Sequence, residues 1–244
     1  MVDDCYTDPV LVALYDVLNP WAACDEFYLS LLLSATAVLD VGCGTGRLLH
    51  RAREAGHTGR LCGLDPAEAM LARARRRQDV EWVLGDLTSV TWNQEFDLVV
   101  MTGHAFQVLL GDDELRTALT TIHTALVPGG RFAFETRNPS ARGWERWTSE
   151  DVDEVTGADG EVVRVWHEVE TPVDGDLVRF TTTASSPSWS APRTSRSTLR
   201  FLDVPTLSGF LTEAGFVVEE QFGHWDRSPV TATSPEIITV ARRP

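Results

Sequence analysis

Three glycines follow a short apolar segment in the first fifth of the chain. Residues 37–41 are rich in strand-forming side chains, and the glycines come directly after them at Gly42, Gly44 and Gly46. Apolar residues then recur with helical spacing from Leu48 to Ala52, which predicts a strand, a tight turn and a helix. Glycines in such a turn let the backbone bend sharply and approach a bound ligand closely. The segment therefore predicts a site for a small cofactor.

The spacing of these glycines disfavours a nicotinamide dinucleotide. The dinucleotide pattern G-x-G-x-x-G requires glycine at position 47, where this chain has Arg47. The chain also has no lysine, so it cannot supply a Tyr-x-x-x-Lys pair, a lysine Schiff base or a phosphate-binding lysine. A nicotinamide-dependent oxidoreductase is thus the less favoured alternative.

The elements that must position this turn alternate along the chain. Two helices are expected over residues 9–33, broken at Asn19-Pro20, and strand–helix units continue to residue 135. Further strands are expected at residues 61–64, 80–84, 96–101 and 131–135, with helices over 67–77 and 112–126. This alternation predicts an α/β fold with a doubly wound, mostly parallel, seven-stranded Rossmann-like sheet. The helical pattern resumes at 204–214, and residues 215–218 and 236–241 are expected to be the two closing strands.

A different pattern occupies the region between these elements. Residues 162–169 and 177–182 alternate with period two around Val173-Asp-Gly-Asp176, which predicts an antiparallel hairpin, and the Ser/Thr/Pro/Arg-rich residues 185–197 are expected to form a loop. We therefore expect residues 140–199 to form a β-rich insertion that acts as an acceptor lid. Residues 1–139 and 200–244 would form the cofactor-binding domain, with residues 1–34 as N-terminal lid helices.

The glycine segment resembles motif I of class I S-adenosylmethionine-dependent methyltransferases, acid-x-Gly-x-Gly-x-Gly, with Asp40 at the acidic position. Residues 85–87, 95–100 and 126–132 resemble later elements of that family in the same order. The resemblance implies S-adenosyl-L-methionine as cofactor and S-adenosyl-L-homocysteine as product. It further implies that Asp65 binds the ribose hydroxyls, that Pro66 and Met70 flank the adenine, and that the element Gly85, Asp86 and Leu87 contacts the adenine edge. Because ligands of doubly wound sheets bind beyond the carboxyl ends of the strands, Met101 is expected near the transferable methyl.

Two residues are candidates for catalysis at the acceptor. His104 follows the expected fourth strand by three residues, and its surroundings resemble the sugar-amine N-methyltransferase branch, in which a histidine faces the acceptor. Tyr15 matches a tyrosine on the family's N-terminal lid helix. Methyl transfer is an in-line displacement, so alignment provides much of the catalysis, and a base is needed only if the acceptor must lose a proton. Either side chain could instead have a packing role.

Several other side chains could line an acceptor pocket, and each could equally well serve the packing of its own region. Arg137 could bind an acidic group or form a surface ion pair, and His167 is expected to face solvent or belong to the sheet. Aromatic residues that could form a wall, together with one histidine of the C-terminal loop, are Trp144, Trp147, Trp166, Trp189, His224 and Trp225.

Charge and composition narrow the range of expected binding partners. The formal net charge is −15, with acidic residues concentrated over 145–176, which disfavours nucleic acid and could attract a cationic acceptor. The four cysteines lack metal-site spacing, and no apolar run is long enough to cross a bilayer, so we expect no metal, no membrane and a cytoplasmic protein. A small-molecule acceptor is expected, with cationic and aromatic molecules as the candidates. The sequence leaves open its identity, the atom methylated, a monomer or a homodimer, and a non-catalytic protein that only binds the cofactor or its product.

Overall fold

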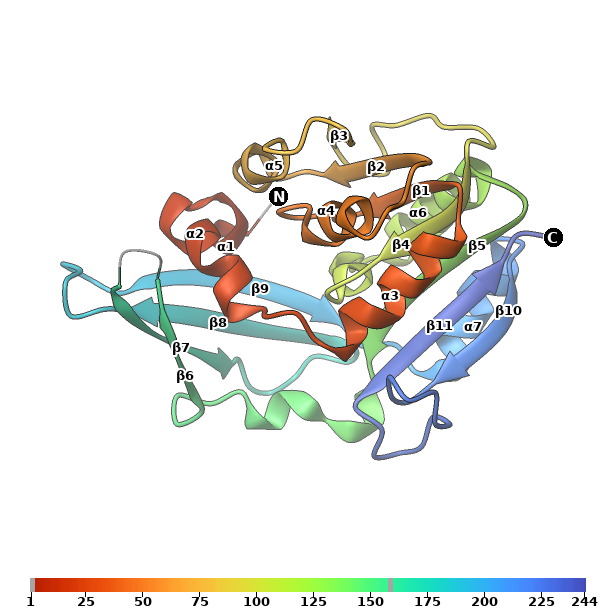
Figure 1. Cartoon of the computed structure of the whole chain (residues 1–244). Helices are drawn as coiled ribbons and strands as arrows, with labels where there is room; N and C mark the ends of the chain where they lie inside the picture. Colours follow the sequence, from red (N-terminus) through yellow and green to blue (C-terminus); the bar gives the residue numbers. More distant parts are fainter. Residues whose placement is uncertain (1–2, 158–159) are drawn as a thin grey trace.

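A seven-stranded sheet forms the centre of the computed structural model, which describes residues 3–157 and 160–244 (Figure 1). Its strand order is β10-β11-β5-β4-β1-β2-β3. Strands β1 to β5 pair in parallel, whereas β11 is antiparallel to both of its neighbours. The strands are β1 Ala37–Val41, β2 Arg60–Asp65, β3 Glu81–Leu84, β4 Phe96–Met101, β5 Leu126–Arg137, β10 Val217–Phe222 and β11 Glu236–Arg242. The predicted doubly wound, Rossmann-like sheet is confirmed.

Helices cover both faces of this sheet, which explains why its inner strands are apolar on both sides. Helices α3 (Ala23–Ser34) and α4 (Arg47–Glu54) pack on one face with Val38, Leu98 and Ile238. Helices α6 (Asp112–Ala125) and α7 (Val204–Glu213) pack on the other face, against Phe132 and Phe134. The remaining helices are α1 Asp4–Thr7, α2 Pro9–Leu18, α5 Glu68–Ala74, and the short 3₁₀ segments η1 Ala105–Val108, η2 Pro139–Ala141 and η3 Gly143–Arg146. Within the described ranges no helix is both long and apolar enough to cross a bilayer.

A second sheet has four antiparallel strands in the order β6-β7-β8-β9: β6 Val152–Thr156, β7 Val162–Val169, β8 Leu177–Ser185 and β9 Arg193–Arg200. The β7–β8 hairpin agrees with the prediction. The loop expected over residues 185–197 is confirmed only for 186–192, because β9 begins at Arg193 and pairs with β8 from Ala184↔Arg193 to Leu177↔Arg200. Its Ser/Thr/Arg composition hides the strand, since main-chain pairing and the buried Ser195 stabilise it rather than apolar alternation.

The last strand pair begins later than predicted. Gly215 has a φ of 89° and ends α7, because Phe216 N donates to Leu211 O at 2.9 Å and Gly215 N donates to Thr212 O at 3.0 Å. These bonds satisfy carbonyls at the helix end and need a left-handed residue. Strand β10 therefore starts at Val217 instead of Gly215.

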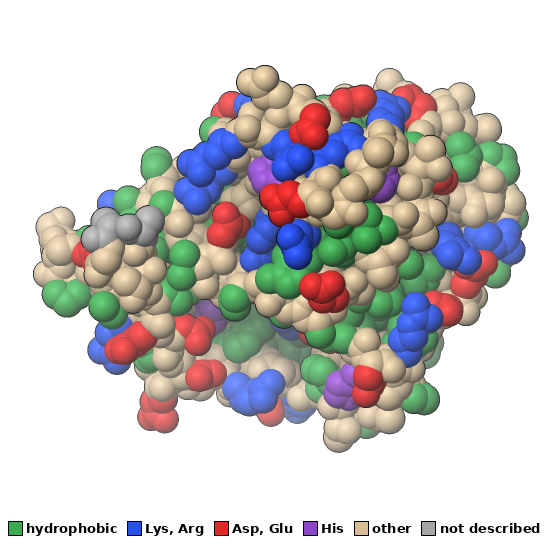
Figure 2. All heavy atoms as spheres, in the orientation of Figure 1, with side chains coloured by type: hydrophobic (Ala, Val, Ile, Leu, Met, Phe, Trp, Pro, Cys, Tyr) green, Lys and Arg blue, Asp and Glu red, His purple; other side chains and the backbone are tan. Residues whose placement is uncertain are grey.

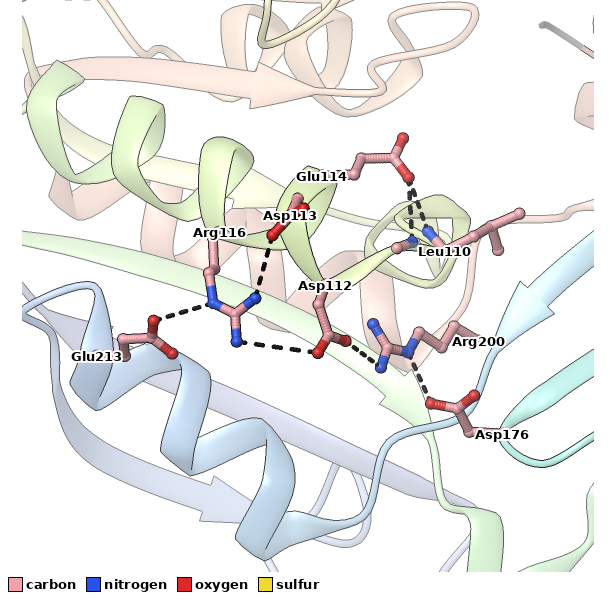
Figure 3. A network of polar contacts seen from close by, with 9 residues as sticks. Leu110, Asp112, Asp113, Glu114, Arg116, Asp176, Arg200 and Glu213 are labelled. Carbon is pink, nitrogen blue, oxygen red and sulfur yellow. Dashed lines mark hydrogen bonds and ion pairs between the residues drawn. The ribbon is translucent and has the colours of Figure 1, made fainter.

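An arginine network attaches the second sheet to helix α6 (Figure 3). Arg200, at the end of β9, bonds Asp112 and Asp176 at 2.7 Å each, and its side chain is only 11% exposed. Asp112 begins α6, so the end of β9 is held against that helix. The backbone oxygen of Arg200 also accepts a bond of 2.9 Å from Gln107 Nε2 in η1. These contacts fix the four-stranded sheet beside the carboxyl ends of the parallel strands.

The N-terminal helices contact the second sheet and helix α5, which lies beside the first sheet (Figure 1). Leu11 and Leu14 of α2 pack with residues of β7 and β8, whereas Val12 packs with Ala67 and Met70 next to β2. The Asp8 side chain accepts from Val10 N at 2.8 Å and Leu11 N at 3.3 Å and forms an ion pair with Arg193 of β9. It therefore caps α2 and also holds the helix against the second sheet.

Candidate functional site

The glycine turn lies between β1 and α4. Gly42, Gly44 and Gly46 have φ values of 74°, 56° and 76°, in the left-handed region where only glycine is relaxed. A Cβ on Gly46 would lie 2.4 Å from Cη2 of Trp82, so this glycine is also required for packing. The turn brings its backbone to the edge of the sheet where the parallel strands end, the edge at which such sheets bind ligands.

Asp65 stands at the end of β2, next to this turn. It is buried, and its two carboxylate oxygens accept from Gly44 N and Ala67 N, each at 2.8 Å. Burial raises the pKa of Asp65, and the two backbone amides act in the opposite direction. Because each carboxylate oxygen has two lone pairs, Asp65 can still accept from a pair of ligand hydroxyls while it braces the turn.

Asp40, at the end of β1, lacks a partner for one of its oxygens. It is 1% exposed, and Oδ1 has no hydrogen-bond partner within the described residues. Burial, together with the nearby Asp65 and Glu135, raises the pKa of Asp40 to about 8. A buried, unpaired carboxylate is costly unless it meets a positive group. The donor set therefore fits a ligand that carries an ammonium beside the glycine turn.

The other predicted cofactor residues follow the same strand ends. Met70 is buried, and its Cε would be 3.2 Å from a Cβ on Gly44, whereas Pro66 is exposed. Asp86 is exposed, and its side chain accepts from Thr88 N at 2.9 Å and Thr88 Oγ1 at 2.6 Å, which shapes the turn after β3. The remaining three are the partly buried Gly85 and the buried Leu87 and Met101.

Tyr15 of α2 lies next to two loops. A Cβ built on Gly44 would lie 3.9 Å from its Cε1, and a Cβ on Gly103 would lie 3.8 Å from its hydroxyl. Burial raises the pKa of Tyr15 to about 12, so the phenol stays neutral. The neighbouring Asp16 accepts from Thr45 Oγ1 at 2.6 Å, which holds α2 to the glycine turn. The structure thus brings Tyr15 between the glycine turn and the loop that carries His104.

His104 is paired with a carboxylate from a distant strand. Its Nε2 lies 3.0 Å and 3.1 Å from the two carboxylate oxygens of Glu236, the first residue of β11. Since a carboxylate only accepts, Nε2 carries the proton in the neutral imidazole and Nδ1 is left as the basic nitrogen. His104 has a φ of 63°, and its backbone N donates to Glu135 Oε1 at 2.9 Å.

Glu135 and Tyr28 form a buried pair beneath this histidine. The Tyr28 hydroxyl donates to Glu135 Oε2, and burial raises the pKa of both groups. Trp225 packs on Tyr28, with ring centroids 5.9 Å apart. Sequence reasoning missed Glu135, Glu236 and Tyr28, since each occurs in an ordinary strand or helix pattern. A weak signal was the acidic residue inside the apolar run at 132–135.

Arg137 lies two residues beyond Glu135 at the end of β5. Gln107 Oε1 accepts from its backbone N at 3.2 Å and from its Nη1 at 3.1 Å, and the guanidinium carbon lies 5.2 Å from the centre of a Trp147 ring. Across the sheet, Arg137 is the register partner of Glu236. A positive group and the His104–Glu236 pair therefore occur at adjoining backbone positions.

Some of the predicted aromatic residues gather beside Arg137. Trp147 packs against Phe180 and His167, with centroids 4.9 Å and 6.1 Å apart, and Trp144 packs against Phe201 at 4.6 Å. His167 does not face solvent: it is partly buried, its Nδ1 lies 2.9 Å from Thr182 Oγ1, and burial lowers its pKa.

The other candidates lie elsewhere. The indole N–H groups of Trp166 and Trp189 donate to Glu168 at 3.2 Å and Glu161 at 3.0 Å, and His224 is exposed. In Figure 2 the visible face is hollowed between the four-stranded sheet and α3, with hydrophobic side chains at the bottom and charged side chains of both signs around it.

The segment that contains the glycine turn matches a known protein family. Residues 38–130 match the family described as "Methyltransferase domain". The match covers the glycine turn, the end of β2 and the His104 loop. Over these residues the chain is therefore similar to a methyltransferase domain.

Curated relatives match part of the chain. It is 36% identical over 137 residues to a 2-phytyl-1,4-naphtoquinone methyltransferase of Thermosynechococcus vestitus, a match that covers 50% of this chain and 59% of the relative. It is 32% identical over 148 residues to a cypemycin N-terminal methyltransferase of a Streptomyces species, covering 57% and 60%. The matched region thus spans about three fifths of the length of these relatives.

Solved structures are similar over nearly the whole chain. An S-adenosylmethionine-dependent methyltransferase from Clostridium acetobutylicum has a TM-score of 0.76 at 16% identity and covers 94% of this chain and 96% of its own. The amino pentose methyltransferase CalS10 from Micromonospora echinaspora, solved with S-adenosylmethionine bound, has a TM-score of 0.72 at 24% identity and covers 96% and 97%. At these identities the likeness concerns the fold.

Proposed function

We propose that this chain transfers a methyl group from S-adenosyl-L-methionine to the nitrogen of a small amine. The observation that carries the proposal is the position of Tyr15, which lies next to both Gly44 of the glycine turn and Gly103 before His104. The expected donor site and the histidine–carboxylate pair therefore share one compartment. The β-rich region 140–199 and the N-terminal helices would enclose the acceptor within it.

The donor-binding roles follow from the chemistry of each side chain. Asp40, with its unpaired buried oxygen, suits the ammonium of the methionine portion, and Asp65 suits the two ribose hydroxyls. The backbone of the glycine turn would approach the ligand closely, as its left-handed residues allow. The adenine would lie between Met70 and the turn after β3, where Gly85, Asp86 and Leu87 supply its edge contacts.

The roles of the residues around the acceptor follow from the His104–Glu236 pair. When bound, S-adenosyl-L-methionine would supply a methyl group activated by its sulfonium; the amine lone pair would form the new C–N bond as the C–S bond breaks and its electron pair stays on sulfur. His104 takes up the amine proton on Nδ1, because Glu236 holds Nε2–H and stabilises the resulting imidazolium. Tyr15, neutral at physiological pH, orients the amine by a hydrogen bond instead of acting as a base.

Two measurements on the purified protein test the proposal. Calorimetric titration with S-adenosyl-L-methionine, S-adenosyl-L-homocysteine and NADH should give micromolar binding of the two adenosyl ligands and none of NADH. Methyl-labelled donor should then transfer label to a panel of small amines, and His104→Ala should reduce that transfer while donor binding persists. Binding without transfer to any acceptor would mean a protein that holds the cofactor without catalysis, and binding of NADH alone would mean an oxidoreductase.

A further inference from the structure

The partly buried arginine at the end of β5 points to the chemical class of the acceptor. We propose that Arg137 binds a carboxylate of the acceptor, so that the acceptor is an amino carboxylic acid whose amine lies at His104 and Glu236. This inference rests on the proposed function and adds to it a substrate class and a specificity-determining residue.

The Arg137 guanidinium has N–H donors that form no hydrogen bond within the described residues. In the described structure it donates one hydrogen bond, to Gln107 Oε1 at 3.1 Å, and no carboxylate of residues 3–157 or 160–244 lies within 4.0 Å of it. Other partly buried arginines do have such partners; Arg200, for example, bonds two carboxylates. A guanidinium has five N–H donors arranged to bind a carboxylate with two parallel bonds. Arg137 therefore retains the donors that recognition of a carboxylate requires.

The guanidinium is also held in place before any ligand arrives. Gln107 is 1% exposed, and its Oε1 accepts from both the backbone and the side chain of Arg137. The same amide donates through Nε2 to the Arg200 backbone, which fixes its orientation from the other side. Trp147 lies against the guanidinium as a cation–π partner. An arginine fixed in this way loses little conformational entropy when it binds.

The charges around Arg137 favour a carboxylate over a phosphate group. Burial lowers the pKa of Arg137, whereas the nearby Glu236, Glu135 and Tyr6 act in the opposite direction. Two carboxylates thus act on the guanidinium without pairing with it. An amino acid carries one negative and one positive charge, so its binding leaves the net charge of the site unchanged. A diphosphate would bring at least two further negative charges into a partly buried acidic site, at a desolvation and repulsion cost.

The register of the sheet sets the distance between the two charged groups of the acceptor. Arg137 and Glu236 are direct partners across β5 and β11, and such antiparallel partners have Cβ atoms about 4.5–5.5 Å apart. Glu236 in turn holds His104. The amine and the carboxylate of the acceptor are therefore a few bonds apart, and Trp147 with Phe180 offers an aromatic wall for an apolar side chain.

Binding measurements on protein saturated with S-adenosyl-L-homocysteine test the inference. The probes are L-phenylalanine, β-phenylalanine and 4-aminobutyrate, their carboxamides, and phosphoethanolamine, each titrated calorimetrically. We expect at least one carboxylate to bind about tenfold or more tightly than its carboxamide, the difference that a charge-assisted bidentate contact provides. Arg137→Met should abolish this preference, and Arg137→Lys should retain only part of it. Arg179→Met, which removes an exposed arginine paired with Asp174, should keep the wild-type preference.

The outcomes separate this inference from the function on which it rests. Equal binding of carboxylates and carboxamides, no binding of any carboxylate probe, tighter binding of phosphoethanolamine, or a preference that survives in Arg137→Met would each overturn the inference and leave the donor site intact. Donor-product binding is measured first on each variant and shows that it is folded. Failure of the wild-type protein to bind S-adenosyl-L-homocysteine would instead overturn the proposed function, and the inference with it.

Discussion

Arg137 and Glu236 face each other across β5 and β11, yet their charged groups do not pair. Arg137 is held by Gln107 and Trp147, whereas Glu236 is held by His104. A direct ion pair between these neighbours would satisfy both charges and leave nothing for a ligand. Because they do not pair, the Arg137 guanidinium and the His104–Glu236 pair lie side by side as two separate polar groups. This is the arrangement required to bind a molecule with two opposite charges.

Glu236→Gln should slow methyl transfer without weakening donor binding. The amide can still contact His104 Nε2, but it no longer stabilises the imidazolium that forms when the amine proton is taken up. We expect kcat to fall by about 10- to 100-fold. Steady-state kinetics with labelled donor, together with titration of S-adenosyl-L-homocysteine, would measure both effects.

A double-mutant cycle provides the control for this variant. If Glu236 acts through His104, the losses in His104→Ala and Glu236→Gln should be far from additive in the double variant. Additive losses would show that the carboxylate has a separate role.

Asp40 should make the stability of the ligand-free protein depend on pH. Burial and the neighbouring acids raise its pKa to about 8, above the value near 4 of an unfolded aspartate. Between these values the folded state retains a proton that the unfolded state has lost, so the free energy of unfolding contributed by Asp40 decreases as pH rises from about 4 to 8 and then levels off. Denaturant melts of wild type and Asp40→Asn across this range should show a shallower decline in the variant.

The same carboxylate should release a proton when the donor binds. An ammonium beside Asp40 favours the charged form and lowers its pKa, so at pH 7 binding should release close to one proton. Calorimetry of S-adenosyl-L-methionine binding in buffers of different ionisation enthalpy would measure it. Asp40→Asn should bind about 10- to 100-fold more weakly, with little proton release. Proton release that is unchanged in Asp40→Asn would assign the titration to another group.

Gly46→Ala should destabilise the protein strongly, and Gly56→Ala provides a matched control. At Gly46 the new methyl group would lie 2.4 Å from Trp82, and φ is 76°. Overpacking and left-handed strain together cost about 2–5 kcal/mol. Gly56 has a φ of 95° with nothing within 4 Å, so only the strain of about 1–2 kcal/mol applies. Urea unfolding would compare the two, and equal losses would argue against the packing role of Gly46.

Gln107→Leu should affect the acceptor rather than the donor. Without the amide, Arg137 loses its fixed position, and the leucine leaves the Arg200 carbonyl without its donor. We expect KM for the acceptor to rise about tenfold or more while kcat and donor affinity change little. A drop in kcat at unchanged KM would place Gln107 in the chemistry itself. The Arg179→Met variant again serves as the surface control.

The parts of the fold that could be predicted are those with local causes. The glycine turn, the acids at the ends of β1 and β2, and the β7–β8 hairpin each depend on residues near one another in the chain, so their patterns are visible in the sequence. Strand β9 and the start of β10 were missed or misplaced for the converse reason. The polar residues of β9 form a strand because β8 provides its main-chain hydrogen-bond partners. Gly215, which the sequence pattern places at the start of a strand, ends α7 instead.

By itself, the sequence determined the class of fold, the position of the glycine turn, and His104 and Tyr15 as residues to consider. Only the tertiary structure decided their partners. Glu236 is 132 positions from His104, and Tyr28 is 107 positions from Glu135. Contacts at such separations are set by strand order and register, which bring β11 beside β5 and α3 beneath both. A charged residue at a strand end looks the same in sequence whether it faces solvent or a neighbouring strand, and the packing of the sheet resolves that choice.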